Sequence, residues 1–179
     1  MQCDAGSHQP NDRATACQLC VAGTFQAGGA AAVCVSCPLG HFQSALGGTG
    51  CLACEQGTFQ SMEAQTACQV CPAGTAHDLV AQTERDSCLA CVAGTYASST
   101  GASVCRACSA GASQASTRST LCRACKPGSY QDRPGEHDCR ECPTGKFSPE
   151  QGGTECLSCE SGAFASAGGI SSCSACTRG

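Results

Sequence analysis

The chain has few of the large apolar side chains from which an ordinary hydrophobic core is built. Its 179 residues include no tryptophan, two tyrosines, five phenylalanines and a single isoleucine, Ile170. A domain of this length normally buries a continuous apolar core, and this sequence lacks the side chains to fill one. We therefore expect covalent cross-links to take the place of that core.

Charged residues are also scarce, and this excludes several classes of function. Only 13% of the residues are charged and the formal net charge is −4, so no strong field draws the chain to nucleic acid. The charge-free run 14–54 is interrupted by Gly, Gln, Ser, Thr and Cys, which excludes a membrane span within it. The four histidines have no recurring Ser or acidic neighbour, so we expect no catalytic site and no enzyme activity.

Cysteine, in contrast, is abundant. The 21 cysteines exceed the content of roughly 8–10% that is typical of a disulfide scaffold in a secreted protein. They form CxxC pairs whose first members recur every 17 residues, except for a step of 20 between Cys68 and Cys88. Such a regular period indicates a tandem repeat array.

The period divides the chain into ten predicted repeats of about 17 residues, each beginning at the second cysteine of a CxxC pair. Their boundaries are 3–19, 20–36, 37–53, 54–70, 71–90, 91–107, 108–124, 125–141, 142–158 and 159–175. Cys176 begins a further, truncated repeat, and the first half of the pair that contains Cys3 would precede residue 1. Because no basic and apolar leader precedes Cys3, we expect a longer precursor.

Each repeat has the same pattern after its first cysteine. A glycine follows three residues later in every repeat, as a backbone position with φ > 0 or a close chain crossing would require. Every aromatic residue stands five residues after that cysteine, where it would cover its own disulfide or the neighbouring repeat. His8, Ala76 and Ser113 take this place in the other three repeats, which we expect to pack less well.

Extended residues, a glycine turn and a short return leg predict a β-hairpin in each repeat. No window shows helical periodicity, and an isolated hairpin is marginally stable in water. We therefore predict a small disulfide-rich, all-β fold. It would be an elongated tandem array of short β-hairpin repeats, each touching mainly its neighbours, with no helix and a minimal hydrophobic core.

Two disulfide schemes fit the spacing. A crossed scheme joins Cys17 to Cys34 and Cys20 to Cys37, and leaves Cys3 unpaired. The other scheme pairs cysteines within a repeat and leaves Cys176 unpaired: Cys3–Cys17, Cys20–Cys34, Cys37–Cys51, Cys54–Cys68, Cys71–Cys88, Cys91–Cys105, Cys108–Cys122, Cys125–Cys139, Cys142–Cys156 and Cys159–Cys173. The odd number of cysteines fits both. A hairpin closed at its base favours the second scheme, in which each loop would contribute about 3 kcal/mol.

The repeat C-P-x-G-x-F-x₈-C-x-x-C is intact at Cys37 and Cys142, and has Ala76 in place of the aromatic residue after Cys71. It resembles the ephrin-receptor-like cysteine-rich repeat and is similar to the single-disulfide module of tumour-necrosis-factor receptor repeats. The resemblance extends from Cys3 to Cys176 and implies a module of surface receptors and secreted matrix proteins. In the tumour-necrosis-factor receptor module, cysteines 14 residues apart bond to each other. The resemblance thus implies the within-repeat scheme.

The spacing CxxC-x₁₃-CxxC also suits a Cys₄ zinc site. Zinc modules usually have basic surfaces, whereas Lys126 and Lys146 are the only lysines, and the lone Cys3 fits paired sites poorly. We therefore expect no metal and no cofactor, and keep an intracellular Cys₄ zinc protein as a third interpretation. A redox CxxC would need a helix N-terminus that the sequence does not predict.

Two features vary between repeats and are candidates for recognition. Arg106, Arg123 and Arg140 each follow the first cysteine of a CxxC pair, at intervals of 17 residues. Regular stacking would align them in a stripe that suits an anionic glycan or an acidic protein. The repeat 71–90 contains three extra residues, and such insertions map to loops that can carry contacts.

These patterns predict a non-enzymatic extracellular segment, such as a stalk, spacer or adhesion rod, of a larger cell-surface or secreted protein. The alternative is the ligand-binding ectodomain of a cell-surface receptor. In either case the expected partner is a protein or glycan at the cell surface or in the matrix. We expect no nucleic-acid partner and no direct membrane insertion of this segment.

Overall fold

The computed structural model describes residues 2–11 and 15–177, whose regular structure consists of two-residue strands and one 3-10 turn, η1 (Arg85–Ser87). The strands are β1 (Ser7–His8), β2 (Gln18–Leu19), β3 (Thr24–Phe25), β4 (Val35–Ser36), β5 (His41–Phe42), β6 (Leu52–Ala53), β7 (Thr58–Phe59), β8 (Gln69–Val70), β9 (Thr75–Ala76), β10 (Leu89–Ala90), β11 (Thr95–Tyr96), β12 (Arg106–Ala107), β13 (Ala112–Ser113), β14 (Arg123–Ala124), β15 (Ser129–Tyr130), β16 (Arg140–Glu141), β17 (Lys146–Phe147), β18 (Leu157–Ser158), β19 (Ala163–Phe164) and β20 (Ser174–Ala175). The described residues contain no α-helix, as predicted, and η1 is a single 3-10 turn.

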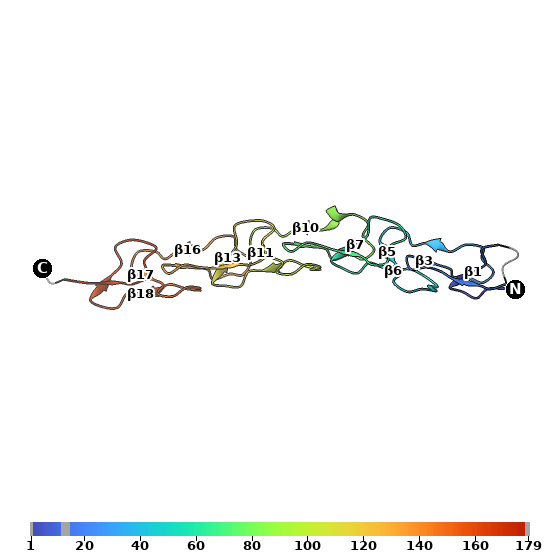
Figure 1. Cartoon of the computed structure of the whole chain (residues 1–179). Coiled ribbons are helices and arrows are strands. Elements are labelled where there is room, and N and C mark those ends of the chain that lie inside the picture. Colours follow the sequence, from blue (N-terminus) through green and yellow to red (C-terminus); the bar gives the residue numbers. More distant parts are fainter. Residues whose placement is uncertain (1, 12–14, 178–179) are drawn as a thin grey trace. The chain divides into compact units, whose positions relative to one another are not determined.

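The strands pair in sequence order as two-stranded antiparallel sheets, visible as successive hairpins in Figure 1. In the hairpin of β3 and β4, for example, Phe25 lies opposite Val35. The strand β3 follows a tight turn in which the Thr24 amide donates to the Val21 carbonyl, at 3.0 Å. Gly23, at the third position of this turn, has φ +86°, which a side chain would disfavour. The prediction of a disulfide-rich, all-β array of tandem hairpins is confirmed.

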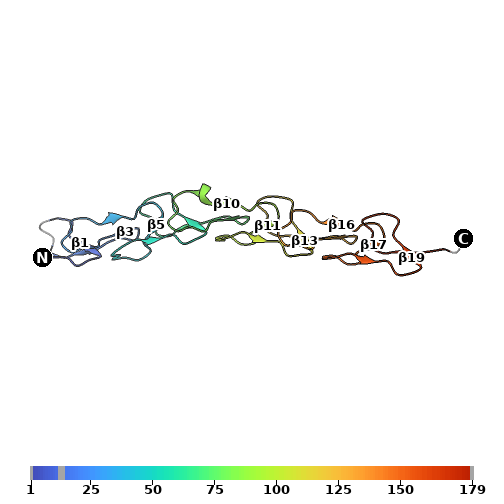
Figure 2. The ribbon, with the colours of Figure 1, turned by 180° about the vertical axis from the view of Figure 1, so that it is seen from behind.

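The chain divides into two compact units. The N-terminal unit comprises Met1–Pro72, Ala76–Leu89 and Thr100–Val104, and the C-terminal unit comprises Ala73–Thr75, Ala90–Ser99 and Cys105–Gly179. Within each unit the hairpins follow one another in chain order, as both views show (Figures 1 and 2). Within each unit, side chains at equivalent positions of successive hairpins can therefore be compared.

Backbone hydrogen bonds join each hairpin to the next one inside a compact unit. Between the hairpins closed by Cys108–Cys122 and Cys125–Cys139, they run from the Gly111 amide to the Gln131 carbonyl, from the Gln114 amide to the Glu136 carbonyl and from the Gly135 amide to the Cys108 carbonyl, at 2.8, 3.3 and 2.8 Å. Equivalent bonds recur in the N-terminal unit. Because these bonds use main-chain groups, the stacking tolerates variation in most side chains.

Contacts also extend past the next hairpin, which the sequence did not predict. A Cβ atom added to Gly111 would overlap the carbonyl oxygen of Gly152, which belongs to the second hairpin along the chain. The same relation holds between Gly23 and Ala64 in the N-terminal unit. The expectation that each repeat touches mainly its neighbours is therefore incomplete, since a hairpin also meets the next but one.

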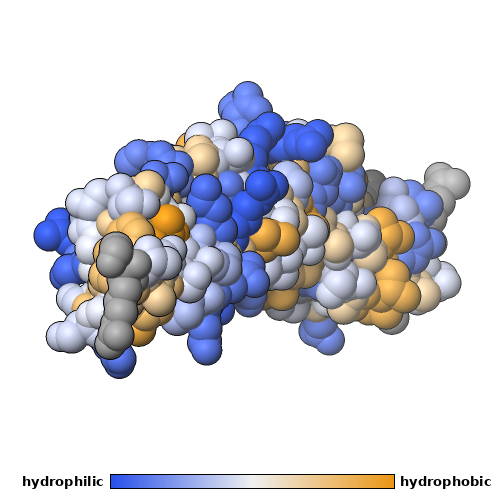
Figure 3. All heavy atoms as spheres, turned by 90° about the vertical axis from the view of Figure 1, so that its left-hand side faces the viewer, coloured by the Kyte–Doolittle hydropathy of each residue, from blue (hydrophilic) through white to orange (hydrophobic). Residues whose placement is uncertain are grey.

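The buried interior consists mainly of cystine and short polar side chains, so the prediction of a minimal hydrophobic core is confirmed. The first cysteine of most hairpins is fully buried, and the largest fully buried side chains include Gln60 and Gln131. Many Leu and Val side chains are exposed, and in Figure 3 hydrophobic atoms form separate patches between hydrophilic ones. Disulfides thus replace a conventional core here.

Candidate functional site

The side chain five residues after the first cysteine contacts the disulfide of the following hairpin at His8, Phe59 and Ser113. Phe59 forms a buried cluster with Cys71 and Cys88, which close the next hairpin, and is 4% exposed. The sequence left open whether this side chain covers its own disulfide or the neighbouring repeat. In the structure, Phe59 covers the neighbouring repeat. Ala76 is buried and Ser113 is half-buried at this position, so the smaller side chains do not leave it open to solvent.

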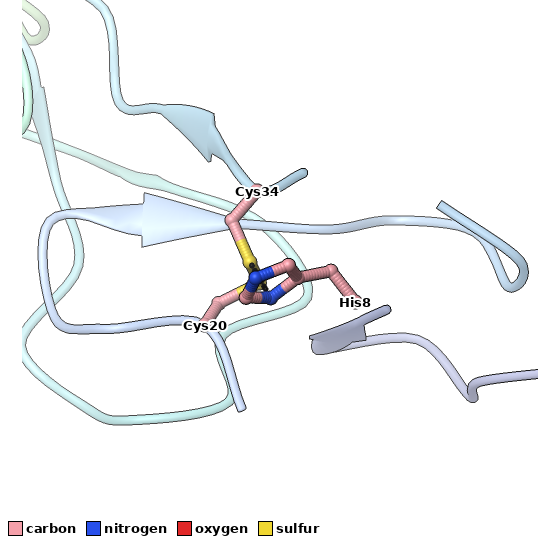
Figure 4. A group of neighbouring side chains, drawn as sticks. All are labelled: His8, Cys20 and Cys34. Atoms are coloured by element: carbon pink, nitrogen blue, oxygen red, sulfur yellow. Dashed lines mark hydrogen bonds between the residues drawn. A yellow bond between two sulfur atoms is a disulfide. The ribbon is translucent and has the colours of Figure 1, made fainter. Parts of the chain in front are cut away.

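His8 takes this position in the first hairpin and lies against the disulfide Cys20–Cys34 (Figure 4). Its Nδ1 atom is 3.2 Å from the Cys34 sulfur, and the three side chains come within 4.8 Å of one another. His and two Cys would suit a soft metal ion if both sulfurs were thiolates. In this structure the sulfurs are bonded to each other, so the contact is a polar cover on a disulfide.

Ten disulfides are present, and they are the pairs of the within-repeat scheme. They join Cys3–Cys17, Cys20–Cys34, Cys37–Cys51, Cys54–Cys68, Cys71–Cys88, Cys91–Cys105, Cys108–Cys122, Cys125–Cys139, Cys142–Cys156 and Cys159–Cys173. Cys176 is free and exposed. A Cys₄ zinc site would require these bonds to break, because the metal binds thiolates.

A glutamine stands six residues after the first cysteine in six repeats, and its role was missed from the sequence. These residues are Gln9, Gln26, Gln43, Gln60, Gln114 and Gln131. The Gln131 side chain donates to the Asp138 carbonyl at 2.7 Å and accepts from the Arg133 amide at 3.2 Å. The Gln131 side chain is 1% exposed, and its two hydrogen bonds close the hairpin loop from the interior. Recurrence at a fixed position was the available signal.

Replacing Gln131 with alanine should lower the free energy of unfolding by about 2 kcal/mol, because it removes two hydrogen bonds made by a buried side chain. His77 has the same position and accepts from the Leu79 amide, so Gln131→His should recover part of the loss. Denaturation in guanidinium with intact disulfides measures both. Gln43→Ala removes equivalent bonds in a more exposed loop and should cost less than about 1 kcal/mol. Equal losses for Gln131→Ala and Gln43→Ala would contradict this explanation.

The three arginines singled out from the sequence occupy equivalent strand positions. They begin β12, β14 and β16, and all three are exposed. Their cross-strand partners five residues after the first cysteine are Tyr96 for Arg106, Ser113 for Arg123 and Tyr130 for Arg140. All lie in the C-terminal compact unit. Opposite residues of an antiparallel pair project to the same face, so each arginine lies beside the side chain that covers a disulfide.

Two of these arginines lie in a stretch of sequence without acidic residues. The stretch 87–131 contains no Asp or Glu and includes four basic residues: Arg106, Arg118, Arg123 and Lys126. Arg140 lies just beyond it and contacts Asp132, with 3.6 Å between its Nη1 and the carboxylate oxygen. Among the described residues, no ion pair involves Arg106 or Arg123. The positive charge at these three strand positions that is not balanced by an ion pair therefore comes from Arg106 and Arg123.

The insertion in the repeat 71–90 forms a surface loop that ends in η1, drawn in green in Figure 1. Ser87 donates its hydroxyl hydrogen to the Gln82 side chain at 3.1 Å, and Gln56 donates to the Asp78 carbonyl at 2.6 Å. A bridge between Phe59 and Gln82 ties the loop to the preceding hairpin. These bonds hold the insertion against the preceding hairpin.

The comparisons with known proteins bear on the same hairpins. Residues 44–86 and 114–154 match the family model described as tyrosine-protein kinase ephrin type A/B receptor-like. The chain contains ephrin-receptor-like cysteine-rich repeats. The second matched stretch includes Arg123 and Arg140, whereas Arg106 lies between the two. No curated protein matched the chain.

An ephrin-receptor-like cysteine-rich module points to an extracellular, receptor-type segment that takes part in protein interactions. The family is a non-enzymatic cysteine-rich repeat, and the ten disulfides agree with an oxidising compartment. In the part of the chain that the structure describes, no helix has the length and apolarity needed to cross a membrane. The matched hairpins thus identify the kind of module without naming its ligand.

Proposed function

We propose that this chain is a non-enzymatic structural and interaction segment, such as a stalk, spacer or adhesion segment, of a larger secreted or cell-surface protein. One observation carries the proposal. The same inter-hairpin backbone hydrogen bonds recur at every step inside each compact unit, and the first cysteine of most hairpins is buried. A chain built this way presents its variable side chains on the surface of a repeating scaffold.

The invariant positions support the scaffold in physical terms. In most repeats the turn glycine leaves room for the backbone of the second hairpin along the chain, each buried cysteine is half of a disulfide, and Phe59 covers the disulfide of the next hairpin. The elongated form predicted from the sequence is part of this proposal.

A receptor ectodomain is the second candidate, and the arginines favour it. Three exposed cations at equivalent positions, two of them in a stretch without acidic residues, are more specific than a spacer requires. A receptor would bind a protein or glycan at this surface, whereas a spacer would tolerate loss of any one repeat. Either role fits an extracellular location.

Deleting residues 108–124 should leave a folded protein, because it joins equivalent positions of two repeats and removes one complete disulfide. We expect nine intact disulfides, which is the present ten minus one, and no new free thiol. Small-angle scattering should show a particle shorter by on the order of 10 Å, the width of two stacked strands. Mass spectrometry without reduction checks the disulfides.

The matched control deletes 108–122, which removes the same disulfide but leaves Arg123 and Ala124 as two extra residues between Cys105 and Cys125. This change shifts the hairpins out of step and should break their hydrogen bonds. If both deletions destabilise the protein equally, the scaffold proposal is wrong. If the in-register deletion is folded but abolishes binding to a cell-surface partner, the receptor role replaces the spacer role.

A further inference from the structure

We propose that Arg106, Arg123 and Arg140, with the neighbouring Tyr96 and Tyr130, form a binding face for a linear sulfated glycan. We call these five residues the arginine face. The proposal deepens the function proposed above and rests on its extracellular location. It also goes beyond the family match, which names no ligand for this surface.

The arginine face is regular because its hairpins are joined by equivalent bonds. The Gly94 amide donates to the Gln114 carbonyl at 2.7 Å, and the Gly111 amide donates to the Gln131 carbonyl at 2.8 Å. Residues at the same strand position are thereby related by the same step, and the three arginines form a row along one compact unit. A row of single cations, one for each repeat, suits a polymer with charges at regular intervals.

The chemistry of the side chains favours sulfate and carboxylate groups. A guanidinium group keeps its charge and offers paired donors that match both anions in a bidentate arrangement. The tyrosines are cross-strand neighbours of Arg106 and Arg140, and they add a hydroxyl group and an aromatic edge beside the cation. The two tyrosines are half-buried.

The choice of a glycan over other polyanions follows from the compartment and the charge. A chain held by ten disulfides belongs outside the reducing cytosol, where sulfated polysaccharides are available and nucleic acid is scarce. A folded acidic protein would need carboxylate groups fixed on its surface at the same spacing as the row of arginines. A flexible linear polyanion adapts to the row directly, and the absence of acidic residues over 87–131 removes local repulsion.

The arginines are not equivalent, and their difference gives the proposal an internal test. Arg140 forms an ion pair with Asp132, with 3.6 Å between its Nη1 and the carboxylate oxygen, and the two side chains are 50% and 47% exposed. The carboxylate competes with any bound anion, so Arg106 and Arg123 should contribute more to binding than Arg140. Asp132→Asn should strengthen binding, because it releases Arg140 without touching the fold of the hairpin.

The experiment measures heparin affinity of the full, oxidised chain by surface plasmon resonance at several salt concentrations. Replacing Arg106 and Arg123 with serine should weaken binding by about tenfold or more and flatten its dependence on salt. The control replaces Arg85 and Arg133, which are also exposed but lie outside the face, with the same change in net charge. This control should change the affinity by less than about twofold.

A transplant tests whether the strand position itself is decisive. Val35 and Leu52 have the corresponding positions in β4 and β6 and are 51% and 57% exposed, so arginine fits there without burying charge. Val35→Arg with Leu52→Arg should raise the affinity for heparin. Equal losses in the two serine pairs, or unchanged affinity in every variant, would overturn the arginine face. Either result leaves the deletion test of the scaffold unaffected, so the two failures are distinguishable.

Discussion

Replacing Gly111 with alanine should lower the free energy of unfolding by about 3–5 kcal/mol. Two physical effects combine at this residue. Gly111 has φ +82°, where a Cβ atom is disfavoured. The added atom would also overlap the Gly152 carbonyl oxygen and lie 3.0 Å from the carbonyl carbon, both of them backbone atoms. The second hairpin along the chain must move away for the side chain to fit.

Gly162 provides a matched control for this prediction. It has φ +86°, but a Cβ atom there meets nothing within 4 Å. Gly162→Ala should therefore cost only the conformational part, about 1 kcal/mol. Guanidinium denaturation compares the two variants, and hydrogen exchange should rise at the amides of the hairpin that contains Gly152. A Gly111 variant as stable as the Gly162 variant would mean that the close contact does not hold the hairpins together.

Replacing Cys125 and Cys139 together with serine should lower the stability by about 3 kcal/mol, since it releases a loop of about 14 residues. The number of free thiols should stay at one, because the two cysteines are bonded to each other and Cys176 is already free. Thiol titration in denaturant counts the thiols, and denaturation measures the stability. The Ser113 hydroxyl, 3.3 Å from the Cys139 sulfur, loses this contact as well.

The control replaces Cys122 and Cys139, which are partners only in the crossed scheme. With the within-repeat bonds of the structure, this change leaves Cys108 and Cys125 without partners and gives three free thiols, the two orphans plus Cys176. In the crossed scheme the outcomes of the two double variants would be exchanged. An unchanged count for C122S/C139S would therefore contradict the pairing.

Spacing alone predicted much of the fold. The 17-residue period predicted tandem hairpins, and the glycine three residues after each first cysteine predicted a positive φ, which Gly23 and Gly111 confirm. These features were visible because turns and cross-links depend on local geometry. The repeat boundaries stay a prediction, since hydrogen bonds join each hairpin to the next and mark no edge between them.

The candidate site was predicted only in part. The positions of Arg106, Arg123 and Arg140 followed from the period, and their role stays a proposal. The ion pair between Asp132 and Arg140 was not predictable, because the seven residues between them must fold into a loop before the two groups meet. The glutamine role was missed for a similar reason. Its recurrence is plain in the sequence, but its partners are main-chain groups that only the closed loop brings within reach.

The sequence by itself determined the local features of this protein: the hairpin, its staple spacing, the turn glycine and the lack of an ordinary core. Only the tertiary structure decided which disulfide each aromatic side chain covers, and that hairpins two steps apart touch. The physical reason is range. Turn geometry acts over a few residues, whereas the cover of Phe59 on Cys71–Cys88 and the approach of Gly152 to Gly111 depend on how whole hairpins stack.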